Sequence, residues 1–213
     1  MHVLTPGIPH LPDDWRGRRT AIFAFLALFV ATTAHLVEWF PGRTMATRKK
    51  KTSRWIVKQR KKKRIRLRGV VQRRETGRPE LCYGRRCREV ELEHEVRITD
   101  FALLFRDCVF ERGVKIGRAE PDAVMVKDGH TCAVEIDNTG HVDRKQMKAK
   151  WKLYDESKFS GYILVVAVTD SRMERLRKGA ELVKDMALFS TFDRLRSDWA
   201  EPWLDWYGKS VRI

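Results

Sequence analysis

The spacing of hydrophobic residues in the first third of this 213-residue chain predicts three helices. Residues 21–31 are all apolar, and their large and small side chains fall on opposite stripes of a helix, which indicates a buried helix. The large stripe holds Ile22, Phe25, Leu26 and Phe29, and the small one Thr20, Ala24, Ala27 and Ala31. A second helix is expected over 34–40, before Pro41-Gly42, and a third from Thr44 to about Lys61 with few apolar anchors.

Beyond this third helix the hydrophobic period changes from that of a helix to that of a strand. Residues 64–72 alternate, 75–80 have the composition of a turn, and 81–83 return as a second strand. Three helices followed by a β-hairpin is the order of a winged helix-turn-helix domain, whose third helix enters the major groove of DNA. We therefore predict a winged-helix domain over 17–88, preceded by an irregular leader over 1–16.

The second half of the chain predicts an α/β domain over 89–213, so that the expected fold class is α+β. A helix over 101–112 is expected to begin at a cap formed by Thr99 or Asp100. Two short strands meet at Asp128-Gly129, a dipeptide that suits a tight hairpin turn. Helix 143–156, strand 162–168, helix 171–184 with Ser171 and Glu174 as a capping box, and strand 187–192 complete a small mixed sheet.

The positive charge of the chain is concentrated in one segment. The net charge is +16, and residues 39–74 hold sixteen Lys and Arg and no Asp or Glu, leaving 28 basic and 28 acidic side chains elsewhere. A block of one sign and this density indicates a polyanionic partner, with nucleic acid as the first candidate and an anionic membrane surface as the second. The residues expected to touch DNA are Arg48, Lys49, Lys51, Arg54 and Lys58 on the third helix and Arg73, Arg74 and Arg78 in the hairpin.

Three carboxylates are expected to converge at one end of the acidic hairpin. Asp122 opens its first strand, and Glu135 and Asp137 lie two apart on the second, on one face. Such acids repel one another unless a cation or a proton lies among them, an arrangement that suits Mg²⁺ or Mn²⁺. The alternative is that they are ordinary solvated residues at strand ends.

Two further features bear on where the protein works. The apolar run after Arg18-Arg19 has the composition of an export-signal core, but it is too short to span a bilayer, and the basic block follows it instead of preceding it. The four cysteines form no CxxC pair, and Cys82, Cys87 and His94 do not have the spacing of a common zinc site. Reduced thiols in a cytoplasmic protein are the simpler interpretation.

The order of these motifs resembles two related groups of proteins. Asp122, the pair Glu135-x-Asp137 and a following lysine-bearing helix are similar to the metal-site scaffold of PD-(D/E)XK, restriction-endonuclease-like nucleases. More closely, the run from about 20 to 206 resembles the plasmid replication-relaxation family. The pieces that carry this likeness are RPELCYG, HEVRITDFALLF, PDAVMV, VEID, KWKLY, ILVVAVTDSRMERL and a late Trp. The resemblance implies a DNA-binding protein of plasmids, phages or mobile elements with a nuclease-like second domain.

The chain departs from the nuclease motif at one position. Asp122 and Glu135 fall on its two metal carboxylates, but Asp137 stands where the motif has its lysine. A cation is needed there to orient the attacking water and to offset charge on the transition state. Lys150, and after it Lys148, are the candidates to replace it.

Two classes of function stay open. One is a metal-dependent DNA endonuclease, and the other is a non-catalytic DNA-binding regulator of replication or transcription that keeps the nuclease fold as a scaffold. A membrane-anchored basic protein is a distant third class. We expect double-stranded DNA as partner, no small-molecule substrate and no membrane, and leave open whether the chain forms a homodimer.

Overall fold

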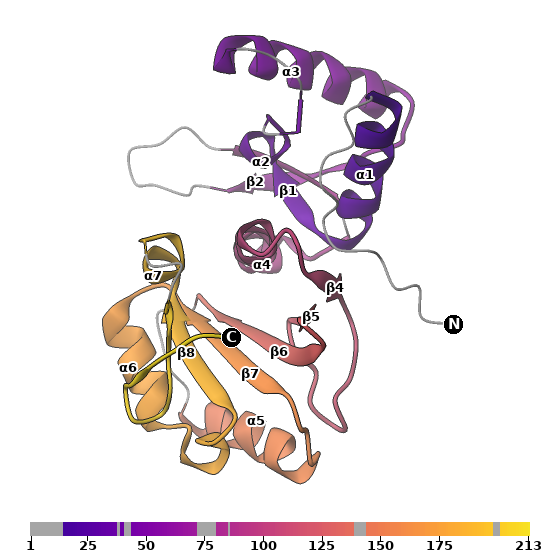
Figure 1. Cartoon of the computed structure of the whole chain (residues 1–213). Helices are drawn as coiled ribbons and strands as arrows, with labels where there is room; N and C mark the ends of the chain where they lie inside the picture. The colour runs from indigo at the N-terminus through magenta and orange to yellow at the C-terminus, as the bar shows by residue number, and fades with distance from the viewer. Residues whose placement is uncertain are drawn as a thin grey trace. The chain divides into compact units, whose positions relative to one another are not determined.

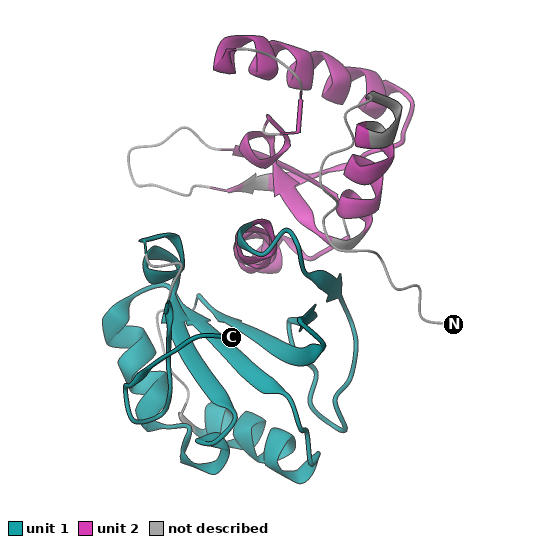
Figure 2. Ribbon diagram, in the orientation of Figure 1, with its two compact units in different colours: residues 1–7, 104–213 teal, residues 8–103 magenta. Residues whose placement is uncertain are grey.

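The computed structural model describes residues 15–37, 39–40, 44–71, 80–84, 86–138, 144–197 and 201–213. Within these residues the fold is mixed α+β, with seven α-helices and two sheets. The chain divides into two compact units, whose described parts are 15–103 and 104–213 (Figure 2). No helix of the described ranges combines the length and the apolar character needed to cross a membrane.

The N-terminal unit combines a small sheet with four helices (Figure 1). Its three strands are antiparallel in the order β1-β3-β2. The elements along the chain are α1 (Trp15–Leu28), β1 (Val30–Thr32), α2 (Thr33–Val37), α3 (Met45–Lys61), β2 (Leu67–Val71), β3 (Glu80–Gly84), a 3-10 turn (Glu89–Glu91) and α4 (Leu92–Leu104). The link between β2 and β3, which carries Arg73, Arg74 and Arg78, lies outside the described residues.

Helix α1 buries its large apolar stripe, as the sequence predicts. Ile22, Phe25 and Leu26 are buried, whereas the small residues of the other stripe are exposed at 20, 24 and 27. The helix ends earlier than the apolar run does, because Val30–Thr32 leave it to form β1 beside β3. Gly84 at the end of β3 has φ +128°, and a Cβ there would lie 2.2 Å from the Phe29 carbonyl oxygen. This close approach lets β1 follow α1 directly.

Helix α4 lies elsewhere in the sequence than predicted. The expected helix over 101–112 is wrong, because α4 spans Leu92–Leu104 and the chain then forms β4 (Val109–Glu111). Leu92 and Val96 pack in a cluster with residues of the three-stranded sheet. The helix therefore belongs to the N-terminal unit, whereas the sequence placed the domain boundary before it, at 88/89.

The C-terminal unit is built on a seven-stranded mixed sheet with strand order β10-β9-β8-β7-β6-β5-β4. Strands β6, β7 and β8 are parallel to one another, and the other neighbours are antiparallel. After β4 come β5 (Ala123–Lys127), β6 (His130–Asp137), α5 (Arg144–Glu156), β7 (Tyr162–Ala167), α6 (Asp170–Lys178), a 3-10 turn (Glu181–Val183), β8 (Ala187–Thr191), α7 (Phe192–Ser197), β9 (Trp203–Leu204) and β10 (Ser210–Val211).

The predicted acidic hairpin is confirmed. Asp128 and Gly129 have φ values of 50° and 82° and connect the paired residues Lys127 and His130, which is the geometry of a two-residue hairpin turn. The register that this turn sets pairs Ala123 with Val134. Asp122, one residue before Ala123, is thereby brought next to the end of β6.

Helices α5 and α6 cover the face of the sheet to which Ala133 points. Their core cluster is formed by Trp151 and Tyr154 of α5, Met173 and Leu176 of α6, and strand residues that include Ile163, Val165 and Phe189. The predicted capping box at Ser171 and Glu174 is wrong, because α6 is capped by Thr169, whose hydroxyl oxygen accepts from Arg172 N at 3.3 Å.

Candidate functional site

The three acidic residues of the hairpin lie near the carboxyl end of β6, but they make separate contacts. Asp122 Oδ2 accepts a hydrogen bond of 2.7 Å from the backbone N–H of Ile136, which fixes this carboxylate against the strand. Alternation along β6 turns Glu135 and Asp137 to the same face as Ala133, where α5 and α6 pack. Each of the two acids meets a cation from a different helix.

Glu135 is held by two side chains of α5. Lys150 Nζ donates to Oε2, and the Tyr154 hydroxyl donates to Oε1 at 2.6 Å. The two donors are four residues apart, one turn along the helix, so that both reach the same carboxylate. The side chain of Glu135 is buried, with a relative exposure of the residue of 4%.

The pKa values of this cluster follow from burial and from the neighbouring charges. Burial raises the pKa of Glu135 to about 7, assisted by the charge of Asp122 and opposed by Lys150. Burial acts to lower the pKa of Lys150, but the carboxylates of Glu135 and Asp122 outweigh it and raise that pKa, so this lysine stays protonated. Burial, together with Glu135, raises the pKa of the Tyr154 hydroxyl, which therefore acts as a donor. Of these three groups, Glu135 is the one whose pKa lies near neutral pH.

Asp137 is bound by Arg172 on α6. Nη2 of the guanidinium donates to Oδ1 at 2.8 Å, and Nε donates to Oδ2, so the pair is bidentate. Arg172 is 3% exposed, and a guanidinium buried to this degree requires a counter-charge. Asp137 supplies it, which gives this aspartate a structural role in the fold.

Two of these residues, Arg172 and Tyr154, are not among the site residues that the sequence predicts. Arg172 stands in the first turn of α6 among residues that read as a capping box, and no local signal distinguishes it from a solvated arginine. Tyr154 is an aromatic residue of helix 143–156, and its residue type alone suggests core packing. Its spacing of four from Lys150 places both side chains on one face of the helix, and this is the sequence signal that links them.

The two candidate lysines of α5 have different surroundings. Lys150 lies over Glu135 and is only partly exposed, whereas Lys148 is exposed on the same helix. The structure therefore brings Asp122, Glu135 and Lys150 together and leaves Lys148 outside this group.

The residues fit a divalent cation only in part. Among the described residues, no group of three or more His, Cys, Asp and Glu side chains is arranged to hold a metal ion. Asp137 does not fit as a ligand, because Arg172 already binds both of its oxygens. Asp122 and Glu135 lie close enough for the charge of Asp122 to raise the pKa of Glu135. Both are hard oxygen donors, and they fit Mg²⁺ or Mn²⁺ if the hydrogen bond from Lys150 to Glu135 is broken.

The second candidate site is the basic helix α3. Thr44 caps it, with its hydroxyl accepting from Thr47 N at 3.2 Å, and the cations of its last turn complement the helix dipole. Its buried side is formed by Thr52, Trp55, Ile56 and Gln59. The ring of Trp55 lies 5.6 Å from those of Phe23 in α1 and Phe40, which anchors the helix to the unit.

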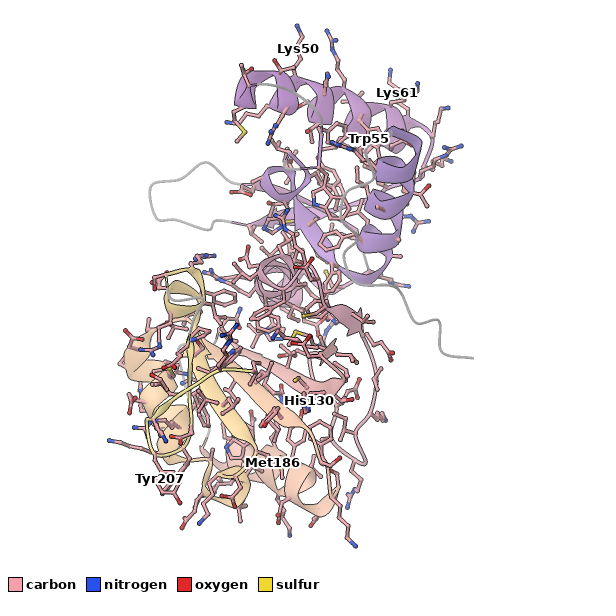
Figure 3. All side chains as sticks on the ribbon, in the orientation of Figure 1. Lys50, Trp55, Lys61, His130, Met186 and Tyr207 are labelled. Carbon is pink, nitrogen blue, oxygen red and sulfur yellow. The ribbon has the colours of Figure 1, made fainter. Side chains whose placement is uncertain are left out.

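The basic residues predicted to touch DNA are not equivalent on this helix. Lys49, Lys51, Arg54 and Lys58 are exposed, whereas Arg48 is half-buried on the inner side, beside Thr52, whose hydroxyl donates to the Arg48 carbonyl at 2.8 Å. In Figure 3, Lys50 and Lys61 point away from the unit and Trp55 points into it. The predicted contacts at 73, 74 and 78 lie outside the described residues.

Comparisons of the chain with protein-family models, with curated proteins and with solved structures find no match. The resemblance to the replication-relaxation family therefore rests on the sequence motifs alone.

Proposed function

We propose that the protein is a DNA-binding protein of a plasmid, phage or mobile element, with a winged-helix N-terminal unit and a C-terminal unit that cuts or nicks DNA with Mg²⁺ or Mn²⁺. The observation that carries the enzymatic part is the cluster of Asp122, Glu135 and Lys150, in which a lysine from α5 stands beside the carboxylate pair. A nuclease of the resembled class needs two carboxylates and one cation, and this cluster supplies all three.

The topology of the two units supports this proposal. The N-terminal order α-β-α-α-β-β, with strand order β1-β3-β2, agrees with a winged helix-turn-helix in which α3 is the recognition helix. In the C-terminal unit three antiparallel strands are followed by a helix and a parallel strand, which agrees with a nuclease-like core. The basic segment of the chain coincides with α3 and the strand after it.

Hydrolysis of a phosphodiester joins a water oxygen to phosphorus and breaks one P–O ester bond, and the leaving oxygen takes up a proton. A divalent cation, when bound, polarises the phosphate and the attacking water. Asp122 and Glu135 would hold it. The ammonium group of Lys150 would orient the water and offset charge that develops on the phosphate oxygens. Tyr154 would keep the Glu135 carboxylate in place, and the Asp137–Arg172 pair would keep β6 and α6 in register.

A second function is favoured by one specific observation. Both oxygens of Glu135 and both of Asp137 are already bound by protein donors, which is the arrangement of a scaffold that needs no metal. Under this alternative, the protein is a non-catalytic regulator of replication or transcription that retains a nuclease-like fold.

Incubation of supercoiled plasmid with the protein distinguishes the two. We expect nicked or linear product with Mg²⁺ or Mn²⁺ and none with EDTA. Glu135→Gln, which keeps the shape of the side chain, should abolish the product. Glu156→Gln is the matched control, because this acid lies on the exposed part of α5 and pairs with Lys152. Absence of cutting under every condition would favour the regulator, and cutting by Glu135→Gln would exclude this cluster as the active site.

A further inference from the structure

The outward face of α3 is formed by four residues, Lys50, Arg54, Val57 and Lys61. They are spaced four, three and four apart, which places them on one face of a helix, opposite the buried Thr52, Trp55, Ile56 and Gln59. All four are exposed. We call this set the outward ridge of α3.

Val57 is out of place on a surface built only to neutralise phosphates. Its side chain is 52% exposed, although a β-branched residue is a weaker helix former than the lysine and arginine around it and gains nothing in water. Met45, the other large apolar residue of α3 that is exposed, stands in the first turn on a different side. An exposed apolar side chain in the centre of a basic ridge suits contact with the methyl group of thymine.

Arg54 stands one turn before Val57 on the ridge. An arginine reads guanine through a bidentate contact with O6 and N7 in the major groove. No acidic residue occurs from 39 to 74, so the helix itself holds no carboxylate that competes for this guanidinium. Three residues of helix rise by about 4.5 Å, which is close to the roughly 3.4 Å between base pairs. Arg54 and Val57 can therefore contact neighbouring base pairs.

The lysines at the two ends of the ridge are placed for a different role. Lys61 comes eleven positions after Lys50, or about 16 Å along the helix, so the two lysines flank the stretch that holds Arg54 and Val57. With Arg54 and Val57 at the floor of the groove, the two lysines reach the phosphates on either side. Such contacts fix the position of the helix but carry no sequence information.

We propose that Arg54 and Val57 are the specificity-determining residues of α3, and that the preferred duplex carries a guanine next to a thymine at the centre of the contact. This inference rests on the proposed DNA-binding function. The inference goes beyond DNA binding because it requires the protein to discriminate between sequences, which phosphate contacts alone do not provide.

The test begins with selection by the full-length protein from a randomised duplex library, followed by competition binding with single-base variants of the selected duplex. Wild type should enrich a site containing the guanine–thymine step. Replacement of that thymine by deoxyuridine removes only the C5 methyl group, and should weaken wild type about 5-fold or more. Val57→Ala should bind both duplexes equally.

Arg54→Ala should lose discrimination at the guanine, by about 5- to 100-fold, and Arg54→Lys should restore it only in part because lysine lacks the bidentate fork. Lys58→Ala is the control. It should weaken all sequences alike and lower the salt slope of binding by about 0.9. Circular dichroism and the melting temperature check that these surface variants stay folded.

The outcomes separate the two proposals. DNA binding without any enriched sequence, or an enriched site whose recognition is unchanged in Arg54→Ala and Val57→Ala, would overturn this inference and leave DNA binding standing. Absence of binding to any duplex at low salt would overturn the proposed DNA-binding function and this inference with it.

Discussion

At the scale of single residues, Glu135 is subject to opposing influences on its ionisation. Burial and the charge of Asp122 favour the neutral acid, whereas Lys150 and the hydroxyl of Tyr154 favour the carboxylate. A divalent cation would add to the second group. The same carboxyl therefore links protonation, the ion pair with Lys150 and any metal that binds.

The raised pKa of Glu135 predicts a pH dependence of stability. The pKa of a glutamate carboxyl is about 4.3 in an unfolded chain, and that of Glu135 is about 7 in the fold. Glu135 therefore holds its proton more tightly when the protein is folded. This contribution to stability is complete below the unfolded pKa and is lost as the pH rises through 7. We compare the free energy of unfolding of wild type with that of Glu135→Gln in EDTA. Between pH 5 and 7, the wild-type value should fall relative to the variant by up to about 1.4 kcal/mol per pH unit. Urea titrations followed by tryptophan fluorescence measure it, and a constant difference across this range would contradict the assigned pKa.

The Asp137–Arg172 pair predicts a second residue-scale outcome. Asp137→Asn leaves a buried guanidinium without its counter-charge and should lower the free energy of unfolding by about 3 kcal/mol or more. The double variant Asp137→Leu with Arg172→Met should recover most of this loss. Asp155→Asn, at an exposed acid of α5, is the control and should change stability by less than about 0.5 kcal/mol.

The variant Asp137→Lys also tests the ion pair between Asp137 and Arg172. It introduces the lysine that the resemblance to nucleases implies at this position, but in the fold it sets a second cation against Arg172. We expect a destabilised protein with no gain of cleavage. Gain of cleavage in a protein as stable as wild type would show that Arg172 can move away and that Asp137 disables the site.

At the scale of elements, sequence patterns predict secondary structure correctly where the interaction that determines it is between neighbours in the chain. The turn at Asp128-Gly129, the extent of α3 to Lys61 and the large apolar stripe of α1 are all set by neighbours in sequence, and the sequence predicts all three. The hairpin register then brings Asp122 beside Glu135 without further information.

Elements that depend on distant partners were not predictable in this way. Thr99 and Asp100 look like a helix cap, yet both lie inside α4. The Thr99 hydroxyl donates to the Val30 carbonyl at 2.6 Å, and Asp100 Oδ1 lies 2.9 Å from His35 Nε2. Likewise, β1 continues an apolar run that reads as helix, and only its pairing with β3 turns it into a strand. The role of Arg172 is of the same kind, because its partner lies on another element.

The positions of Lys150 and Lys148 on α5 predict that their substitution has different effects on plasmid cleavage. Lys150→Met removes the ammonium group that contacts Glu135 and should abolish plasmid cleavage while leaving DNA affinity unchanged. Lys148→Met removes the same charge from an exposed position of the same helix and should retain cleavage within about 3-fold. Equal loss in both variants would mean that the basic surface of α5 acts through DNA binding and not at the scissile phosphate.

At the scale of the whole molecule, α4 sets where the N-terminal unit can be separated. A fragment ending at residue 88 exposes the cluster that Leu92 and Val96 complete, and it loses the bond between His35 and Asp100. Each buried side chain of this size is worth about 1.5–3 kcal/mol. We therefore expect residues 1–104 to unfold cooperatively and to bind duplex DNA, and residues 1–88 to be unfolded at 25 °C by circular dichroism. A stable, DNA-binding 1–88 fragment would contradict the assignment of α4 to this unit.

The segregation of charge and chemistry between the units predicts that binding and cleavage separate cleanly. Six phosphate contacts would give a log–log slope of affinity against salt of roughly −5, and Lys50→Ala with Lys58→Ala should reduce its magnitude by about 1.8. This double variant should still cut at low salt, where residual affinity suffices, and lose cutting as salt rises. Glu135→Gln should keep the full slope and cut at no salt concentration, because it alters only the carboxylate beneath α5. Fluorescence anisotropy and plasmid nicking over the same salt series measure both properties. If Glu135→Gln also changed the slope, the carboxylate cluster would itself be part of the DNA-binding surface, and its proposed role would have to move from chemistry to recognition.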